Sequence, residues 1–192
     1  MSTSWNNPII MQEASALMAL SSDLQEPFEA AISAFMDIPG RIICTGIGKS
    51  GHVATKVAAT MTSTGSPAFF LHPTEAAHGD LGAVLDNDAI LAFSRSGRAA
   101  EMTTVLAYGQ SKGVPIVLIS ENDTDSLADF ATVVLKMPAI QEAWGHAPTT
   151  STIMQMALGD AIAVTLAQKK GFTDKDFHAI HPGGELGRKL KL

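Results

Sequence analysis

The stretch RIICTGIGKSG, residues 41–51, joins a short apolar run to a glycine-rich turn. The apolar part, residues 41–47, has the length of a β-strand and no alternation of polar and apolar residues, which is typical of a strand buried on both faces of a parallel sheet. Directly after it, Val53, Val57 and Met61 are spaced one helical turn apart. A buried strand, a glycine turn and a helix in this order form the repeating unit of parallel α/β folds.

Four further apolar runs continue this pattern along the chain. They cover residues 67–72, 88–94, 114–120 and 132–137, and residues 99–112 have the spacing of a helix. Alternating strands and helices are typical of one sheet with helices packed on both faces. The sequence therefore predicts an α/β fold, a doubly wound five-stranded parallel sheet flanked by helices.

Two helical segments are predicted outside this core. Apolar residues at alternating spacings of four and three predict an N-terminal helical arm over about residues 9–36, which Pro27 should kink or restart. Residues 149–169 form a second predicted helix that is apolar nearly all round, which is typical of a buried helix. We expect this helix to be covered between subunits of a homo-oligomer.

Length and composition narrow the function classes. The 192 residues correspond to one domain, and we expect a single domain over residues 1–192. A net charge of −6 provides no overall positive field for nucleic acid or an anionic membrane surface, so an anionic ligand needs a local site. Cys44 is the only cysteine, which fits a reducing compartment. We expect a cytoplasmic protein without nucleic-acid or membrane partners.

The glycine turn at residues 45–51 has three interpretations. A P-loop needs a glycine five positions before Gly48, where this chain has Ile43. Three glycines match the G-x-G-x-x-G spacing of dinucleotide-binding turns, but the acidic residue expected after the second strand is replaced by the segment around His72. A purely structural turn leaves Lys49 unexplained. We therefore expect backbone N–H groups of this turn to hold an anion at a helix N-terminus.

A second turn, residues 94–98, follows the third predicted strand. Ser94, Ser96 and Gly97 in front of a helix can form a phosphate cradle that needs no metal, and a sugar phosphate is the natural occupant. The alternative is an ordinary serine N-cap. Both turns should lie at the carboxyl ends of strands, where open α/β sheets bind their ligands.

Ionisable residues are scattered over the remaining loops. Taken singly, each is typical of a solvated or capping side chain. The spacing of His72 and His78 matches no known metal-site pattern, so we expect no metal site. The scattered residues that could carry acid–base chemistry are Glu75, His78, Asp80, Glu101, Glu142 and His181.

Taken together, these segments resemble the sugar isomerase (SIS) domain family, and within it the arabinose 5-phosphate isomerases. The resemblance extends from about Ile9 to Leu192. It is carried by motifs that occur in the same order, at residues 46–52, 63–65, 69–73, 75–82, 147–152, 158–161 and 181–188.

The resemblance implies an SIS fold and an enzyme that interconverts D-ribulose 5-phosphate and D-arabinose 5-phosphate through an enediol, without cofactor or metal. The product would supply 3-deoxy-D-manno-octulosonate (KDO) for lipopolysaccharide or capsule. The family's active-site residues match Lys49, Glu101, Glu142 and His181. One glutamate is expected as the enediol base, His181 as an acid–base group, and Lys49 as the group that neutralises phosphate or enediolate charge.

The resemblance also implies a homotetramer. Because His181 lies far along the chain from the two turns, we expect it to serve the site of a neighbouring subunit. The expected substrate-binding residues are Gly48, Ser50, His78, Ser94, Ser96, Gly97, Thr149 and Thr150.

Some features depart from the family pattern. Arg98 stands where relatives usually have glutamate, residues 144–146 replace a longer segment, and no CBS domains are expected after the SIS domain. The alternatives are a non-catalytic regulator that binds a sugar phosphate, and an isomerase for a phosphoheptose or hexulose phosphate. Retention of the four acid–base residues favours an enzyme over a regulator.

Overall fold

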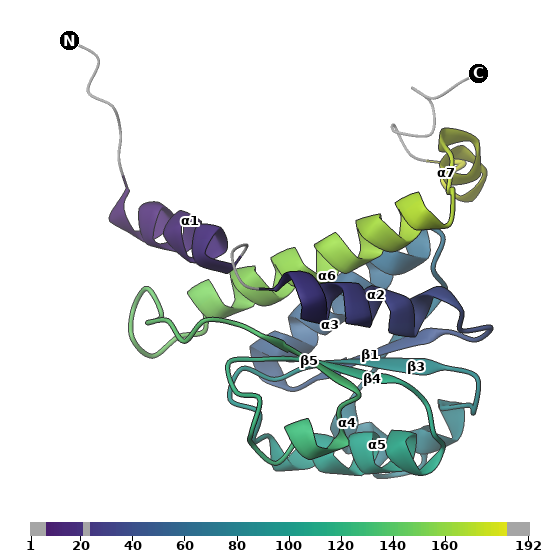
Figure 1. The fold of residues 1–192 in the computed structure, drawn as a ribbon, viewed down its shortest axis with the longest axis horizontal. Helices are drawn as coiled ribbons and strands as arrows, with labels where there is room; N and C mark the ends of the chain where they lie inside the picture. Colours follow the sequence, from purple (N-terminus) through teal and green to yellow (C-terminus); the bar gives the residue numbers. More distant parts are fainter. Residues whose placement is uncertain (1–6, 21–23, 184–192) are drawn as a thin grey trace.

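The computed structural model describes residues 7–20 and 24–183, and its five strands form one all-parallel sheet in the order β2-β1-β3-β4-β5 (Figure 1). Each strand lies within the apolar run that predicted it, so the doubly wound five-stranded sheet is confirmed. The strands are β1 (Ile42–Gly46), β2 (Ala68–Leu71), β3 (Ala89–Phe93), β4 (Ile116–Ser120) and β5 (Val133–Lys136).

Helices cover both faces of the sheet. Ile42 and Cys44 of β1 pack into the core formed with α1, α2, α3 and α6, whereas Ile43 packs into the core under α5. Neighbouring residues of a strand point to opposite faces, so both must be apolar when both faces are covered. The helices are α1 (Pro8–Leu20), α2 (Gln25–Met36), α3 (Gly48–Ser63), α4 (Pro73–Ala76), α5 (Ala100–Ser111), α6 (Thr150–Lys169) and α7 (Asp174–Ile180).

The helices α3 and α6 lie side by side and run in the same direction. A Cβ on Gly159 of α6 would lie 2.4 Å from a methyl carbon of Val57 of α3, so glycine permits the close contact. Beyond the C-terminal ends of the two helices, a Cβ on Gly65 would lie 2.3 Å from the ring of Phe172. Since α3 starts directly after β1, both helices begin at the carboxyl edge of the sheet.

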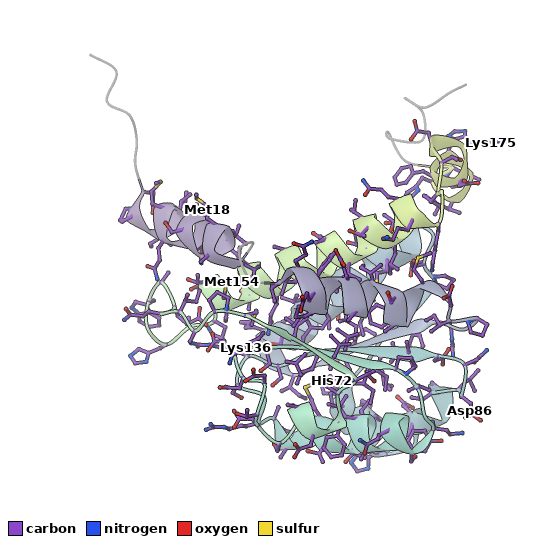
Figure 2. The ribbon with its side chains drawn as sticks, viewed as in Figure 1. Met18, His72, Asp86, Lys136, Met154 and Lys175 are labelled. Atoms are coloured by element: carbon purple, nitrogen blue, oxygen red, sulfur yellow. The ribbon has the colours of Figure 1, made fainter. Side chains whose placement is uncertain are left out.

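The N-terminal arm consists of α1 and α2. Pro27 lies in the first turn of α2, where a missing N–H group is tolerated, so the chain restarts its helix there as predicted. Ile9, Ile10 and Met18 of α1 are exposed, and Met18 lies on the outer side of α1 in Figure 2.

The C-terminal segment contains α7, a short helix that was not predicted from the sequence, and His181 is the residue that ends it. A capping box between Thr173 and Asp176 starts α7. Figure 1 shows α7 at the far end of α6 from the loop that leads into that helix. The rest of the predicted motif, residues 184–188, lies outside the described residues.

Candidate active site

The carboxyl edge of the sheet has a switch point between β1 and β3. These strands are neighbours, but the chain leaves β1 toward β2 on one side and leaves β3 toward β4 on the other. The two connections therefore diverge at the strand ends, which is the position where open α/β sheets bind ligands. The predicted turns at residues 45–51 and 94–98 follow these two strands and flank this position.

The β1–α3 turn presents free backbone donors. Gly48 has φ +58°, Lys49 is exposed, and Ser50 is half-buried. Within the described part of the chain, no side chain caps the N-terminus of α3, so its first N–H groups keep their positive end uncovered. A Cβ on Gly51 would lie 2.7 Å from the carbonyl oxygen of Gly46, so this glycine is needed for close packing of helix on strand.

A small cavity adjoins this turn. Its volume is about 170 Å³, and Gly46, Gly48, His52 and His72 are among its lining residues. The His72 ring accepts a hydrogen bond from the Thr74 N–H at 3.3 Å and caps the short helix α4. This bond accounts for one nitrogen of His72.

The β3–α5 turn folds back on its own backbone. The Ser94 hydroxyl accepts a hydrogen bond from the Gly97 N–H at 3.2 Å, and the Ser96 hydroxyl accepts one from the Arg98 N–H at 3.3 Å. Neither serine caps α5, whose N-cap is Ala99. The serine N-cap alternative is therefore wrong. Gly97 has φ +70°, which explains the glycine in this turn.

Glu142 is buried in the loop between β5 and α6, with its side chain only 1% exposed. Its Oε2 accepts hydrogen bonds from the Thr149 N–H at 2.8 Å, the Thr149 hydroxyl at 3.2 Å and the Ser151 N–H at 3.2 Å. Its Oε1 accepts one from the Ser151 hydroxyl and faces Arg95 Nη1 at 2.9 Å. The carboxylate thus occupies the N-terminal end of α6.

These contacts set the charge of Glu142. Burial alone would raise its pKa, but the hydrogen bonds from Ser151 and Thr149 and the positive charge of Arg95 lower it, and the net pKa is below the usual range for a glutamate. Glu142 is therefore ionised at neutral pH.

Arg95 is the residue of this edge that the sequence did not single out. Its guanidinium contacts Glu121, the Ile140 carbonyl and Glu142, and so joins the loops after β3, β4 and β5. In the sequence, Arg95 precedes Arg98 by three positions, and no local pattern of residues distinguishes the two arginines. In the structure, the Arg98 side chain is 70% exposed. Only the folded sheet brings the partners of Arg95 together.

Other predicted residues have varied surroundings. Glu101 is exposed in the first turn of α5, and the structure shows no hydrogen bond or ion pair of its carboxylate with another described residue. His78 is exposed between α4 and the 3₁₀ helix Asp80–Ala83. Thr150 is buried, and its hydroxyl has no hydrogen-bond partner among the described residues. Thr149 is bonded to Glu142.

His181 lies away from this edge within its own chain. It lines a groove of about 480 Å³ together with β2 and the second half of α3. The α3 part of that groove, residues 55–63, lies mostly about 10 to 20 Å along the helix from Lys49, by the 1.5 Å rise per residue. The His181 ring stacks on Phe177 with centroids 3.9 Å apart, and its Nδ1 lies 2.8 Å from the Phe177 carbonyl oxygen.

Metal-binding clusters and membrane-spanning helices are both absent from the described residues. No three histidine, cysteine, aspartate or glutamate side chains in residues 7–20 and 24–183 gather as a metal site would require. None of the helices in these ranges is both long enough and apolar enough to span a bilayer.

Comparison with known proteins identifies the family. The arabinose 5-phosphate isomerases KdsD of Yersinia pestis and Pseudomonas aeruginosa are 41% and 42% identical to this chain over 96% and 94% of its length. The chain spans only 57% and 56% of these relatives. The structure of Escherichia coli CFT073 c3406 in complex with arabinose 5-phosphate is similar, with 36% identity, a TM-score of 0.86 and coverage of 91% of this chain and 94% of that one. The SIS domain model matches residues 37–165, and the chain therefore belongs to the SIS domain family.

Proposed function

We propose that this protein is an aldose–ketose isomerase that interconverts D-ribulose 5-phosphate and D-arabinose 5-phosphate. The observation that carries the proposal is the likeness to c3406, a structure in complex with arabinose 5-phosphate, over almost the whole of both chains. The names of the KdsD relatives agree with this substrate. We infer a cytoplasmic location, which is supported by the single cysteine of the sequence, the free and buried Cys44.

The phosphate is assigned to the N-terminus of α3. The N–H groups after Gly48 are uncapped within the described residues, and Lys49 adds a positive charge. The neighbouring N-terminus of α6 already holds the Glu142 carboxylate. Between the neighbouring parallel helices α3 and α6, α3 is therefore the one whose N-terminus can accept a substrate anion. Gly48, Ser50, Ser94, Ser96 and Gly97 flank this position, and His78, Thr149 and Thr150 remain proposed substrate contacts.

Isomerisation requires transfer of one proton between neighbouring carbons. A base removes a proton from C1 of ribulose 5-phosphate, the C1–C2 double bond of the enediol forms, and O2 takes up the electron pair and a proton. Return of a proton to C2, with loss of the O1 proton, gives the aldehyde of arabinose 5-phosphate. No electron acceptor is needed in this scheme.

Burial favours Glu101 over Glu142 as the base. Glu101 is exposed at the start of α5, whereas the Glu142 carboxylate is 1% exposed and bonded on both oxygens. In the proposal, Glu101 moves the carbon proton, and Glu142 is an ionised carboxylate that fixes Thr149 and the start of α6. Lys49 neutralises the charge of the phosphate or the enediolate.

His181 is proposed to act in the site of a neighbouring subunit of a homotetramer. Its own-chain position beside β2 and the second half of α3 supports this arrangement, because Lys49 lies at the other end of α3. The Phe177 carbonyl can only accept a hydrogen bond, so His181 Nδ1 donates, and Nε2 is the atom that exchanges protons with substrate oxygens.

The substrate is tested by incubation with ribulose 5-phosphate and identification of the product. Formation of arabinose 5-phosphate without added metal, nucleotide or nicotinamide is expected. No product at high enzyme concentration would refute the proposal.

The shared site is tested by mixing two inactive variants, His181→Ala and Lys49→Ala, under conditions of demonstrated subunit exchange. Part of the activity should return, because some sites then combine a native His181 with a native Lys49. Exchange without recovery would refute the shared site and leave the substrate assignment standing.

A further inference from the structure

We propose that Arg95 is a positioning residue of the active site, which holds Glu142 ionised and in one orientation and affects isomerisation through it. The inference rests on the proposed function, in which Glu142 belongs to the active site. No contact of Arg95 with substrate is invoked.

Arg95 uses three donors for three groups. Its Nε donates to Glu121 Oε1 at 2.8 Å, its Nη2 donates to the Ile140 carbonyl oxygen at 3.2 Å, and its Nη1 lies 2.9 Å from Glu142 Oε1. The backbone of Arg95 is fixed as well, because its carbonyl oxygen accepts hydrogen bonds from the Ser120 hydroxyl at 3.3 Å and from the Glu121 N–H at 2.9 Å. The guanidinium is therefore held from the end of β4 while it holds the loop after β5.

The span of this contact explains why an arginine is used. Arg95 follows β3, and its partners Ile140 and Glu142 follow β5, with β4 between the two strands. Two strand spacings amount to about 10 Å, which a long side chain can cross. A planar fork of N–H groups can bond a carbonyl and a carboxylate at once, whereas a lysine ammonium has no such fixed geometry.

The charges around Glu142 leave Arg95 as its counter-ion. The loop after β4 contributes Glu121, a second carboxylate on the same guanidinium. The start of α6 contributes the hydroxyl and N–H groups of Thr149 and Ser151, and α1 reaches the same loop with the Gln12 amide, which donates to the Gln141 carbonyl oxygen. Among the described residues, Arg95 is the only cation in an ion pair with Glu142.

Loss of Arg95 should therefore raise the pKa of Glu142. Burial, which raises this pKa, would remain, whereas the positive charge of Arg95, which lowers it, would be lost. A proton on Glu142 would weaken its hydrogen bonds from the N–H groups of Thr149 and Ser151. The start of α6 would then lose its anchor at a pH at which the native enzyme keeps it.

The experiment compares Arg95→Met, Arg95→Lys and a matched control, Arg41→Met. Arg41 forms the same kind of ion pair, with the buried Asp88 at 3.2 Å, but at the amino edge of the sheet. Two quantities are measured in each protein: kcat/KM for ribulose 5-phosphate at pH 5 relative to pH 8, and the titration of the Glu142 carboxyl carbon by NMR. The melting temperature records structural damage.

For Arg95→Met we expect the Glu142 titration to move up by about one pH unit and the ratio of activities to fall by up to about threefold, the loss of ionised Glu142 at pH 5 that such a shift produces. Arg95→Lys should lie between this variant and the native protein. Arg41→Met should lower the melting temperature and leave both readouts unchanged. A native ratio together with a native titration in Arg95→Met would refute the proposal, and so would a lower melting temperature as its sole effect.

A second variant, Glu121→Gln, should shift the Glu142 titration in the opposite direction, and it tests the proposal even if Arg95→Met does not fold. Because this variant removes the competing carboxylate, the Glu142 titration should move down in pH. No downward movement would count against the proposal. If the native protein does not convert ribulose 5-phosphate, the proposed function fails, and the NMR titration then decides on Arg95 alone.

Discussion

Each of the two edges of the sheet has an arginine paired with a buried carboxylate, and the two ion pairs have different structural roles. At the amino edge, Asp88 accepts hydrogen bonds from the N–H groups of Arg41 and Leu85 and from the Arg41 guanidinium, all at the starts of β1 and β3. At the carboxyl edge, Arg95 and Glu142 join three loops and the start of α6. The first pair fixes the starts of strands, and the second fixes loops at the edge where the substrate is proposed to bind.

The difference lies in what surrounds each pair. At the amino edge, the loop before β1 packs tightly against the loop before β3, because a Cβ on Gly40 would lie 2.3 Å from the Asn87 carbonyl oxygen. At the carboxyl edge, the start of α3, which no described side chain caps, and the exposed Lys49 lie on the helix next to α6, whose start is bonded to Glu142. Figure 2 shows the two edges through their labelled residues, with Asp86 at one side of the sheet and Lys136 at the other. The same ion-pair chemistry thus stabilises one edge and organises the other.

The largest expected difference concerns two lysines. Lys49→Met at the carboxyl edge should lower kcat/KM about 10²- to 10³-fold, because a positive charge is removed from the proposed phosphate or enediolate. Lys112→Met at the amino edge, where Lys112 pairs with Asp86, should leave kcat/KM unchanged. Steady-state kinetics check both variants, and both should melt near the native temperature. Equal losses in the two variants would erase the functional distinction between the edges.

The next effect concerns the two carboxylates. Glu142→Gln and Asp88→Asn should each lower the free energy of unfolding by about 2–3 kcal/mol, since each leaves a charged arginine without its anion and turns an acceptor into a donor. The arginines are about two-fifths exposed, which reduces the loss below that of a fully buried pair. Urea unfolding measures the stability. Only Glu142→Gln should also lose activity at 25 °C, where both variants are folded.

The same carboxylates should shape acid stability. The pKa of Asp88 is lowered, because the hydrogen bonds from Arg41 and Leu85 and the charge of Arg41 outweigh the upward effect of burial, and the pKa of Glu142 is lowered likewise. Their contributions are therefore fully present above the unfolded values of about 4 and are lost as the pH falls through the folded pKa values. Below about pH 4, unfolding free energy should fall more steeply with pH in the native protein than in either amide variant. Parallel curves would contradict the assigned charges.

The smallest effect concerns two glycines with the same backbone conformation. Gly97 at the carboxyl edge has φ +70°, and Gly113 at the amino edge has φ +71°. Alanine at either position should cost about 1 kcal/mol of stability for the left-handed conformation. A Cβ at Gly97 would also lie 3.1 Å from the Ser120 hydroxyl, whereas a Cβ at Gly113 would have no atom of the described residues within 4 Å. Gly97→Ala should therefore be the less stable of the two and should alone raise KM. Thermal unfolding and kinetics test this order.

The sequence predicted those parts of the fold that depend on local pattern. Each strand run and the long helix that became α6 are encoded by residues adjacent in the chain, and tertiary packing did not override them. The short helix α7 was missed, although the Thr173–Asp176 capping box in front of it is a readable signal. The contact between Glu142 and Arg95 could not be predicted, because Arg95 comes from a different strand end and only the sheet order brings the two together. The roles of Lys49 and Glu101 stay predictions.

The parallel start of α3 and α6 has a consequence for stoichiometry. Taken alone, the N-termini of these two neighbouring helices would be two anion-binding sites of similar affinity. The chain supplies its own anion to one of them, since Glu142 is bonded to the N–H groups of Thr149 and Ser151. Of this helix pair, only α3 is therefore left to bind a phosphate group, and inorganic phosphate should compete with the sugar phosphate for that position.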